Sequence, residues 1–546
     1  MNKIIYILIF FPLIVFSQIQ PQIGDLYDHR VIELTESILP IFIIDTDGNE
    51  VPDETKIEAF LKLIYNGPNQ MNYISDTITN YNGKIGIERR GASSFGYPQT
   101  PYLFETRHEN GENNNVSLID LPAENDWVLL SNYNDKSLIR YVLASHLYEK
   151  MGNYSPRARL CEVFFNGEYY GIYTFTEKIK VDSGRLDIAS LNEDENDGDD
   201  VTGGYIIELN LWNSENSWEL NYSPINHPDF DIHLVYKYPK ADDITNQQKE
   251  YIASYIDSME SALYGFDFIN IDFGYRNFLD VETFIDYFLI NELSRNNDGF
   301  KKSRYFHKDK ASNQGKLKAG PIWDFDWAWK DLNSCSLAEI FSNQDGSGWA
   351  HEINNCFPDN YSPDWYIRMH QDSSYTDQLR CKWEEYRTDF LNELFINNII
   401  DSLAFYVNEA QQRHFQKWPI LGSVTASPEI LPLPETYPEE IEFLKNWISL
   451  RISWLDDNLP GVCTNLKTNV LSKNDFMNIY PNPNSGQFNI NCPTCINVPM
   501  KIKNIFGQYV WEEEIISGEL KLELELNPGL YFVLVNDKFY KKMIIY

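Results

Sequence analysis

The order of strand and helix patterns along the chain limits its fold more than any other feature of the sequence. Apolar and polar residues alternate in short segments of the first half, for example at Ile41–Ile44 and Lys84–Arg89, which predicts strands. Helical periodicity dominates later, at Val281–Ser294 and within residues 375–415 and 438–457. Strands first and helices afterwards indicate an α+β domain with a strand-rich first half and a helical second half.

A hairpin in the first half is the clearest local signal. Aromatic and β-branched residues fill 160–165 and 169–179, and Asn166-Gly167 lies between the two runs. This dipeptide tolerates positive φ at both central positions of a turn, so a two-residue hairpin is predicted. Just before it, Asp135 is expected to cap a helix that runs through Met151.

A change in composition divides the chain near its end. Polar residues follow Pro460-Gly461, which predicts a linker over 461–474. Short strands and turns then continue through 475–546, a pattern typical of a small β-sandwich. Ahead of the linker we expect a main domain over 81–460, with a β-rich segment at 18–80 packed on it.

The N-terminus predicts export. Lys3 precedes the apolar run Ile4–Phe16, and Ser17 is a small residue at a cleavage position, so residues 1–17 fit a signal peptide. The run is shorter than the roughly 20 residues that a membrane helix needs. A retained anchor or a buried strand is the alternative. No later stretch has 18 consecutive apolar residues, so the mature chain is expected to lack a transmembrane span.

The net charge limits the partners that the chain can bind, and the cysteine count limits its disulfides. The chain has 45 Lys and Arg against 80 Asp and Glu, a net charge of −35. Such acidity argues against binding to nucleic acid, where cations must replace counterions on phosphates, and against docking on anionic membranes. Seven cysteines are an odd number, so at least one thiol is expected to be free. Export permits disulfides, and Cys335/Cys356 and Cys492/Cys495 are the first pairs to test.

Three aspartates are the strongest candidates for chemistry. Asp298 lies in a polar bend after an apolar helix, and Asp324 and Asp326 lie among aromatic residues. In a strand-like segment, positions i and i+2 point to one face, so Asp324 and Asp326 are expected to point the same way. Two carboxylates on one face suit Mg²⁺ or Ca²⁺. Turn capping or a buried salt bridge is the alternative.

Two basic segments are candidates for binding phosphate. The first follows a predicted strand and contains Arg90, Gly91, Ala92, Ser93 and Ser94. Its small residues would let backbone N–H groups approach an anion, although a structural turn is the alternative. The second is Lys178, whose ammonium would point away from Glu177 because neighbouring strand residues face opposite sides. A solvated charge pair is the alternative there.

Several short motifs follow one another in a fixed order between residues 80 and 460. They are Arg90–Ser94, Asn125–Leu129, Asn134–Arg140, Phe165–Gly171, Glu177–Ile179, Gly204–Ile206, Asn297–Gly299 and Gly320–Asp326. In this order they resemble the CotH family of secreted, atypical protein kinases. The resemblance implies an atypical kinase-like domain that transfers the γ-phosphoryl group of ATP to protein hydroxyls. It also implies a divalent metal, Mg²⁺ or Mn²⁺, with Ca²⁺ as a further candidate.

The resemblance assigns roles to the residues that match its motifs. Asp298 would orient or deprotonate the acceptor hydroxyl, and Asp324 would be the main metal ligand, with Asp326 assisting. The residues expected to hold the nucleotide phosphates are Arg90, Gly91, Ser93, Ser94 and Lys178. An acidic chain that binds ATP also needs a local positive patch, for which the candidates are Arg89, Arg90, Lys136, Arg140 and Lys178.

One position departs from the family pattern. Gln99-Thr100 stands where family members often carry a lysine pair. If that pair supports nucleotide binding, this chain binds ATP weakly. The alternative function is therefore a catalytically inactive kinase-like protein that binds or scaffolds at the cell surface, with glycans as one class of partner.

The last module carries a separate resemblance. Its motifs are Tyr480-Pro481-Asn482-Pro483, Ser485-Gly486 and Gly529-Leu530-Tyr531 ahead of Lys541-Lys542. They resemble the type A sorting domain of the type IX secretion system of Bacteroidetes. This implies the type IX secretion machinery as a partner. It also implies passage across the outer membrane, followed by release or attachment at the outer cell surface, and leaves the protein substrate open.

Overall fold

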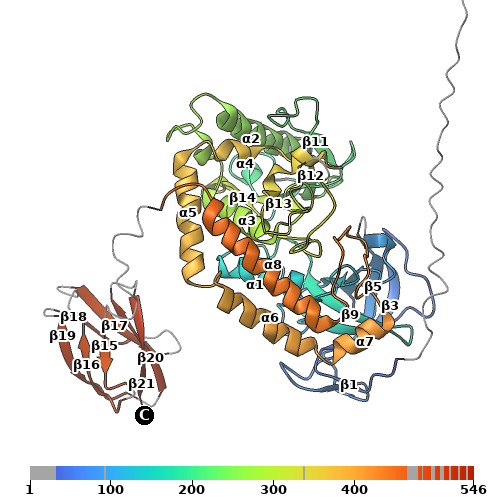
Figure 1. Ribbon diagram of the computed structural model, residues 1–546, viewed down its shortest axis with the longest axis horizontal. Helices are drawn as coiled ribbons and strands as arrows, with labels where there is room; N and C mark the ends of the chain where they lie inside the picture. The colour runs from blue at the N-terminus through green and yellow to red at the C-terminus, as the bar shows by residue number, and fades with distance from the viewer. Residues whose placement is uncertain are drawn as a thin grey trace, which may run out of the picture. The chain divides into compact units, whose positions relative to one another are not determined.

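The computed structural model describes residues 32–463, without 92–93 and 336–337, and residues 478–545, with gaps at 483, 493–497, 505–508, 516–517, 527–528 and 536–538. The predicted signal peptide and Ser93 lie outside these residues. The chain divides into two compact units between Val462 and Cys463. Figure 1 shows the first, from blue strands to orange helices, and the second as red strands.

A closed seven-stranded barrel forms the start of the first unit. Its strands, in order around the barrel, are β2 (Ile41–Asp45), β3 (Ile57–Ile64), β5 (Tyr81–Arg89), β6 (Tyr102–Thr106), β7 (Asp126–Ser131), β9 (Glu168–Glu177) and β8 (Ala158–Phe165). Neighbouring strands are antiparallel except β2 and β8, which pair in parallel and close the barrel. Large apolar side chains such as Phe42, Trp127 and Phe175 fill the interior. A two-residue pairing of β1 (Glu36–Ser37) with β4 (Asn72–Tyr73) lies outside the barrel order.

The predicted hairpin is confirmed as β8 and β9. Asn166 and Gly167 connect the two strands with φ of 50° and 82°. The predicted helix after Asp135 begins later than expected, since α1 spans Arg140–Lys150. The Asp135 carboxylate accepts hydrogen bonds from the backbone N–H of Ser137 at 3.0 Å and of Arg140 at 2.8 Å, so it stabilises a turn that leads into the helix.

A five-stranded antiparallel sheet forms the second layer of this unit. Its order is β11 (Ser217–Glu219), β12 (His233–Tyr238), β10 (Tyr205–Leu209), β13 (Arg304–Lys308) and β14 (Leu317–Ala319). Strand β10 is central because β12 and β13 flank it on either side. The strands predicted near residues 204–209, 303–307 and 317–323 therefore belong to one sheet, although the last one ends at Ala319.

Helices make up most of the second half, as predicted. They are α2 (Asn246–Tyr264), α3 (Val281–Ser294), α4 (Trp365–Met369), α5 (Ser373–Thr388), α6 (Glu393–Val407), α7 (Ala410–Lys417) and α8 (Tyr437–Asn458). Thr245 and Thr436 begin α2 and α8 with capping boxes, in which side chains satisfy the first free backbone N–H groups. Helix α3 is buried from Phe284 to Ser294, contacts α1, α5 and α8, and lies at the centre of the largest apolar core.

The second unit contains two antiparallel sheets. One has the order β15 (Asn478–Tyr480), β16 (Gln487–Asn491) and β19 (Glu519–Glu523). The other has the order β18 (Tyr509–Ile515), β17 (Val498–Asn504), β20 (Gly529–Val535) and β21 (Phe539–Ile545). Phe488 and Ile490 from the first sheet and Ile502 and Val533 from the second share one apolar core, the arrangement of a β-sandwich.

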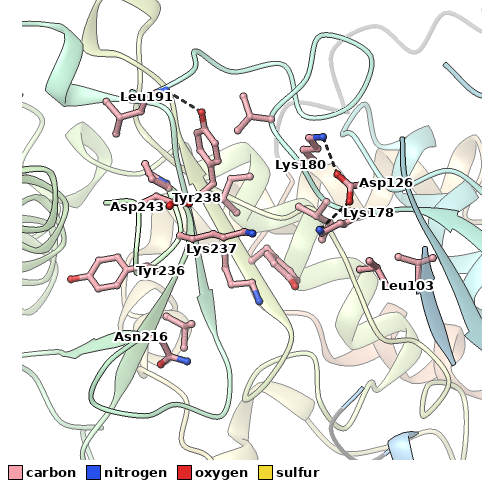
Figure 2. Close-up of a pocket in the computed structure, with 18 of the residues that line it drawn as sticks. Leu103, Asp126, Lys178, Lys180, Leu191, Asn216, Tyr236, Lys237, Tyr238 and Asp243 are labelled. Atoms are coloured by element: carbon pink, nitrogen blue, oxygen red, sulfur yellow. Dashed lines mark hydrogen bonds and ion pairs between the residues drawn. The ribbon is translucent and has the colours of Figure 1, made fainter. Parts of the chain in front are cut away.

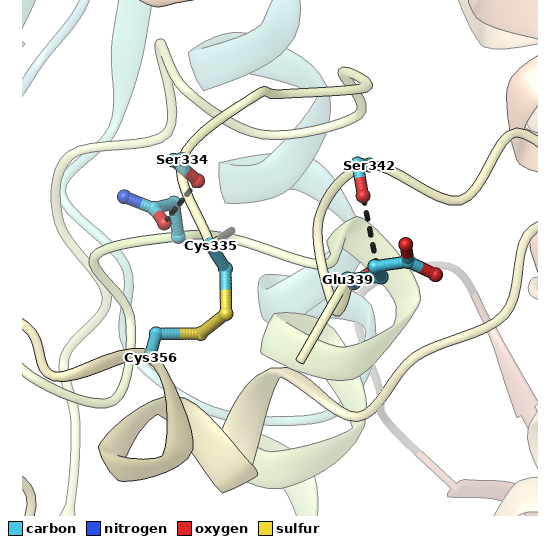
Figure 3. Close-up of a disulfide and its surroundings, with 6 residues drawn as sticks. Ser334, Cys335, Glu339, Ser342 and Cys356 are labelled. Carbon is cyan, nitrogen blue, oxygen red and sulfur yellow. Dashed lines mark hydrogen bonds between the residues drawn. A yellow bond between two sulfur atoms is a disulfide. The ribbon is translucent and has the colours of Figure 1, made fainter. Parts of the chain in front are cut away.

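Cysteines of both units form disulfides. Cys335 and Cys356 are bonded, with 4.9 Å between their Cα atoms, which confirms that pairing (Figure 3). Cys381, Cys463 and Cys492 are also disulfide-bonded, whereas Cys161 is a buried free thiol. Cys495, the expected partner of Cys492, lies outside the described residues. Across the helices that the structure describes, none has both the length and the apolar character to cross a membrane.

Candidate functional site

Two adjoining cavities form a cleft in the first unit. The larger, of about 850 Å³, lies between barrel residues such as Leu103 and Asp126 and sheet residues such as Tyr236 (Figure 2). The smaller, of about 500 Å³, contains the three candidate aspartates. The side chains common to both walls are Arg90, Lys237, Tyr305 and Trp323. The two cavities therefore lie on either side of these four side chains.

Asp324 and Asp326 line the smaller cavity, but not because they share a strand face. The segment after β14 is irregular, and Asp324 has a φ of 60°, which a strand residue cannot adopt. Ser303 Oγ donates to Asp324 Oδ2 at 2.8 Å, and Asn134 Nδ2 donates to Asp326 Oδ2 at 2.9 Å. The expected strand-like conformation is thus wrong, while a sharp turn still places both carboxylates in one cavity.

The electrostatics of the two carboxylates favour binding of a cation. Burial raises the pKa of Asp324, against the lowering influence of Arg90 and of the Ser303 hydroxyl. Burial and the neighbouring charge of Asp324 raise the pKa of Asp326 to about 7. Within the described residues neither carboxylate makes an ion pair. The charges of Arg90 and Lys330 offset only part of the cost of burying these two carboxylates, and a divalent metal would relieve more of it.

Asp298 faces the same cavity from a loop after α3. The helix ends at Arg295, which adopts the left-handed conformation with a φ of 43° and turns the chain. Lys301 Nζ lies 3.0 Å from Asp298 Oδ1 and 3.0 Å from Asp359 Oδ1, and Lys302 also pairs with Asp359. These contacts hold the Asp298 loop against the segment around Asp359.

The Arg90 segment supplies a cation and a tight turn at the same cleft. The Arg90 guanidinium lies over the Trp323 ring, 5.1 Å from its centroid. In the described residues it has no hydrogen bond or ion pair, so it is available to an anion. Gly91 has a φ of 101°, and a Cβ there would lie 2.1 Å from Ser94 Oγ. Gly91 and Ser94 line the smaller cavity, whereas the predicted contact of Ser93 falls outside the described residues.

Lys178 points into the larger cavity, as the strand alternation predicts. Its Nζ lies 3.3 Å from Asp126 Oδ1, and burial lowers its pKa against the opposing effect of Asp126 (Figure 2). Lys180 lies 2.9 Å from both Asp126 and Glu124. Glu177 faces the other way, where its fully buried carboxylate pairs with Arg157 at 2.5 Å. Glu177 is therefore a structural residue and does not hold Lys178.

Basic side chains line the cleft, but most of the cations expected from the sequence are not among them. Lys136 pairs with Glu429, and Arg140 pairs with Asp135 and Glu440, all in the interior. Arg89 pairs with Glu50 at 3.0 Å. None of these three cations lines either cavity. The cations that do line the larger cavity are Lys56, Arg90, Lys178, Lys180, Lys237 and Lys240.

Lys237 is a residue that sequence reasoning missed. It projects from β12 into both cavities, and its Nζ lies 3.0 Å from the buried carboxylate of Glu208 on β10. The alternation of β12 gives Lys237 a face, but its partner lies 29 residues earlier in the chain, so no local pattern identifies it. Asn134 and Ser303 were likewise missed as partners of Asp326 and Asp324.

Gln99 has a structural role. Its side chain donates to the carbonyls of Tyr170 and Ile172 and accepts from Ser131 Oγ and the backbone N–H of Asn132. It is fully buried and lines neither cavity. The amide therefore joins its own loop to strands β7 and β9 of the barrel.

The oxygen donors of the smaller cavity fit Mg²⁺ or Mn²⁺. Mg²⁺ in proteins commonly takes one or two carboxylates and completes its shell with water and substrate phosphates. Asp324 and Asp326 supply two such carboxylates beside Arg90 and the Gly91 turn. A ready-made group of three or more His, Cys, Asp or Glu ligands does not occur among the described residues. A metal bound here would thus depend on ligands from the nucleotide.

Comparison with known proteins gives a family. The family model described as CotH kinase protein matches residues 87–455, more than half of the chain. A second model, described as secretion system C-terminal sorting domain, matches residues 478–546. No curated protein matches the chain.

Two solved structures are similar over parts of the chain. PorZ, a bacterial surface component of the type-IX secretion system of Porphyromonas gingivalis, is 20% identical over 14% of this chain and 12% of its own length, with a TM-score of 0.13. The Helicobacter pylori proinflammatory kinase CtkA is 11% identical over 56% of this chain and 94% of its own length, with a TM-score of 0.19. At these scores neither likeness establishes a shared fold.

The matched regions agree with the resemblances read from the sequence. The first covers the barrel from β5 onward, the five-stranded sheet, the cleft and the helices up to α8, and the second covers the two C-terminal sheets. A type IX sorting domain implies the secretion machinery as a partner and secretion or cell-surface placement. The chain therefore belongs to the CotH kinase family and carries a type IX sorting domain.

Proposed function

We propose that this protein is a secreted protein kinase that transfers the γ-phosphoryl group of ATP to a protein hydroxyl. The observation that carries the proposal is the smaller cavity. It brings together Arg90, the Gly91 turn and Asp298 with Asp324 and Asp326, which make no ion pair in the part of the chain that the structure describes. Phosphoryl transfer requires these elements because the protein mainly positions the groups and neutralises charge.

The nucleotide would lie along the cleft. The larger cavity offers apolar walls, including Val128, Ile206 and Val235, that suit a flat base. Lys178 and Lys237 reach toward the space between the walls and would bind phosphate oxygens as point charges. Arg90 would hold the phosphates where the two cavities meet, and a bound Mg²⁺ would neutralise charge on the terminal phosphates.

Asp298 would act on the acceptor. Its carboxylate would orient the incoming hydroxyl and take its proton as the new O–P bond forms. Lys301 Nζ lies 3.0 Å from Asp298 Oδ1 and would hold the carboxylate in position. The other carboxylate oxygen has no ion pair among the described residues, and it is the one we assign to the acceptor.

The test separates binding from transfer. Purified mature protein should melt at a higher temperature with a non-hydrolysable ATP analogue plus Mg²⁺ than with either alone. With labelled ATP, it should transfer label to itself or to an added protein. Asp298→Asn should lower transfer by about 10²-fold or more while keeping the nucleotide-dependent thermal shift. Asp324→Asn should reduce both.

Asp272→Asn is the matched control, because Asp272 is an exposed carboxylate in a loop outside both cavities. Transfer that is unchanged in Asp298→Asn would refute the assigned mechanism. A thermal shift without any transfer would support the catalytically inactive alternative, a nucleotide-binding surface protein. No shift with any nucleotide and metal would refute ATP binding altogether.

A further inference from the structure

Exposed aromatic side chains lie beside the smaller cavity on segments that also line it. Leu211 and Asp359 line the cavity, and Trp212 and Phe357 follow or precede them closely in the chain. Trp212 is 43% exposed and Phe357 55% exposed, so both rings are open to a partner. Together with Phe230 and Tyr361 they form what we call the aromatic rim.

Contacts between three chain segments hold the rim together. The Phe230 ring stacks on Tyr361 with 3.7 Å between centroids, and the Phe357 ring lies edge-on to His227 at 5.5 Å. Trp212 stacks on His233 at 3.4 Å. Asn360 Nδ2 donates to the Asn210 carbonyl at 3.3 Å, joining the Trp212 segment to the Phe357 segment.

The rim is also fixed to the Asp298 loop. Ser334 Oγ donates to Asn297 Oδ1 at 3.2 Å, and the next residue, Cys335, is bonded to Cys356, which directly precedes Phe357 (Figure 3). Lys301 joins Asp298 to Asp359 on the other side of Phe357. The rim therefore keeps a defined position relative to the carboxylate that acts on the acceptor.

Phe357 combines an unfavourable backbone conformation with an exposed apolar ring. It follows η6 (Ala350–Cys356) with a φ of 48°, in the left-handed region where Gly or Asn is usual. Its ring is nonetheless mostly exposed to water. An exposed apolar ring held in a fixed position indicates a contact surface, since a partner that covers the ring would remove the cost of its exposure.

Acidic residues beside the rim limit the kind of segment that can bind there. Asp229 and Asp231, on either side of Phe230, are exposed and make no ion pair among the described residues. An acidic segment would be repelled there, whereas a neutral or basic one would not. The rings of Tyr361 and His227 stack parallel to the ring of Phe230, so Phe230 presents the edge of its ring to a partner. Protein side chains pack well against ring edges, whereas sugars prefer an open ring face.

We propose that the aromatic rim binds the acceptor segment of a protein substrate. The segment is an extended peptide that carries an aromatic side chain a few residues from its hydroxyl and no acidic residue beside that side chain. This proposal rests on the proposed kinase function, since it is the hydroxyl of the same segment that reaches Asp298.

The experiment measures peptide binding without phosphoryl transfer. The full mature chain is loaded with a non-hydrolysable ATP analogue and Mg²⁺, and dye-labelled synthetic peptides are titrated by fluorescence anisotropy. Each peptide has a central Ser in a Gly/Ala host and one Phe, Tyr or Trp at a single flanking position. We expect about tenfold tighter binding than the host peptide at one or two positions, the gain of one aromatic anchor. Asp residues beside the aromatic should remove the gain.

Phe357→Gly and Trp212→Ser test the rim itself. Both should abolish the aromatic preference while leaving the melting temperature and the nucleotide-dependent shift unchanged, and Gly relieves the strain at position 357. Phe266→Ala is the control, because Phe266 is 98% exposed and lines neither cavity. An aromatic preference that survives both rim variants, or no preference at all, overturns the proposal.

Three further outcomes separate the proposals. Binding of a soluble neutral polysaccharide that depends on Trp212 and Phe357, with no peptide preference, would assign the rim to carbohydrate and overturn the peptide proposal. Phosphoryl transfer without an aromatic preference would leave the kinase function standing and refute the rim. An aromatic preference without any nucleotide-dependent shift would keep the rim as a peptide-binding surface, but it would refute the kinase function and with it the identification of that peptide as the acceptor.

Discussion

At the scale of single residues, the conformation of Gly91 is the least replaceable feature of the cleft. Its φ of 101° is rare for any residue with a side chain, and a Cβ would lie 2.1 Å from Ser94 Oγ. Gly96, five residues later, has open space within 4 Å of the position its Cβ would take. Two glycines of the same loop therefore differ sharply in what they tolerate.

Gly91→Ala should weaken nucleotide binding by about tenfold, because a φ of 101° is strained for alanine and Ser94 Oγ must rotate away from the new Cβ. Gly96→Ala should bind like the wild type. Calorimetric titration of a non-hydrolysable ATP analogue with Mg²⁺ measures both. Equal affinities for the two variants would show that the turn does not contact the nucleotide.

At the scale of elements, α2 and α4 meet around a buried acid. Glu260 on α2 is fully buried and accepts a hydrogen bond from Trp365 Nε1 on α4 at 2.8 Å. Burial raises its pKa from 4.5 to about 8. The folded state thus holds Glu260 protonated at neutral pH, where the unfolded chain ionises it.

This linkage has a definite sign. A raised pKa means that the contribution of Glu260 to stability is complete below pH 4.5 and is lost as the pH rises toward 8. Glu260→Gln keeps an acceptor for Trp365 and cannot ionise. The wild type should therefore lose stability relative to Glu260→Gln by up to about 1.4 kcal/mol per pH unit over that window.

Urea unfolding at several pH values checks this expectation. The two proteins should be similar at pH 4.5, and the variant should be more stable at pH 8. Glu250→Gln is the matched control, since Glu250 is an exposed carboxylate on the same helix. A pH-independent difference between the wild type and Glu260→Gln would contradict the burial argument.

At the scale of the whole molecule, the two units have separate cores. The apolar cluster of the second unit contains only residues from 479 onward, and the clusters of the first unit contain none of them. Cys463 is disulfide-bonded, so a shortened chain should keep it. Separate cores predict that each unit folds by itself.

A chain of residues 32–465 should therefore unfold in one cooperative transition and keep the nucleotide-dependent shift of the full protein. Scanning calorimetry of the full chain should show an additional transition from the C-terminal sheets. A shortened chain that loses cooperativity would show that the sorting domain stabilises the first unit. Fusion of residues 463–546 to a secreted reporter tests export separately.

The sequence by itself determined the features that depend on neighbouring residues. The Asn166-Gly167 hairpin, helix α3, the boundary near residue 460 and the matched family motifs all arise from short-range patterns. The motifs around Asp298, Asp324 and Asp326 also identified these three residues as candidates. Local periodicity and turn chemistry act over a few residues, which is why they can be read without a fold.

Only the tertiary structure decided which charges are free. Lys136 and Arg140 look like phosphate ligands in the sequence, yet Glu429 and Glu440, about 300 residues later, neutralise them in the interior. Lys237 belongs to no sequence motif, yet it lines the cleft. Phe357 is exposed because a disulfide and a left-handed turn hold it at the surface. Long-range pairing sets burial and charge compensation, and no local pattern records which distant residue will be the partner.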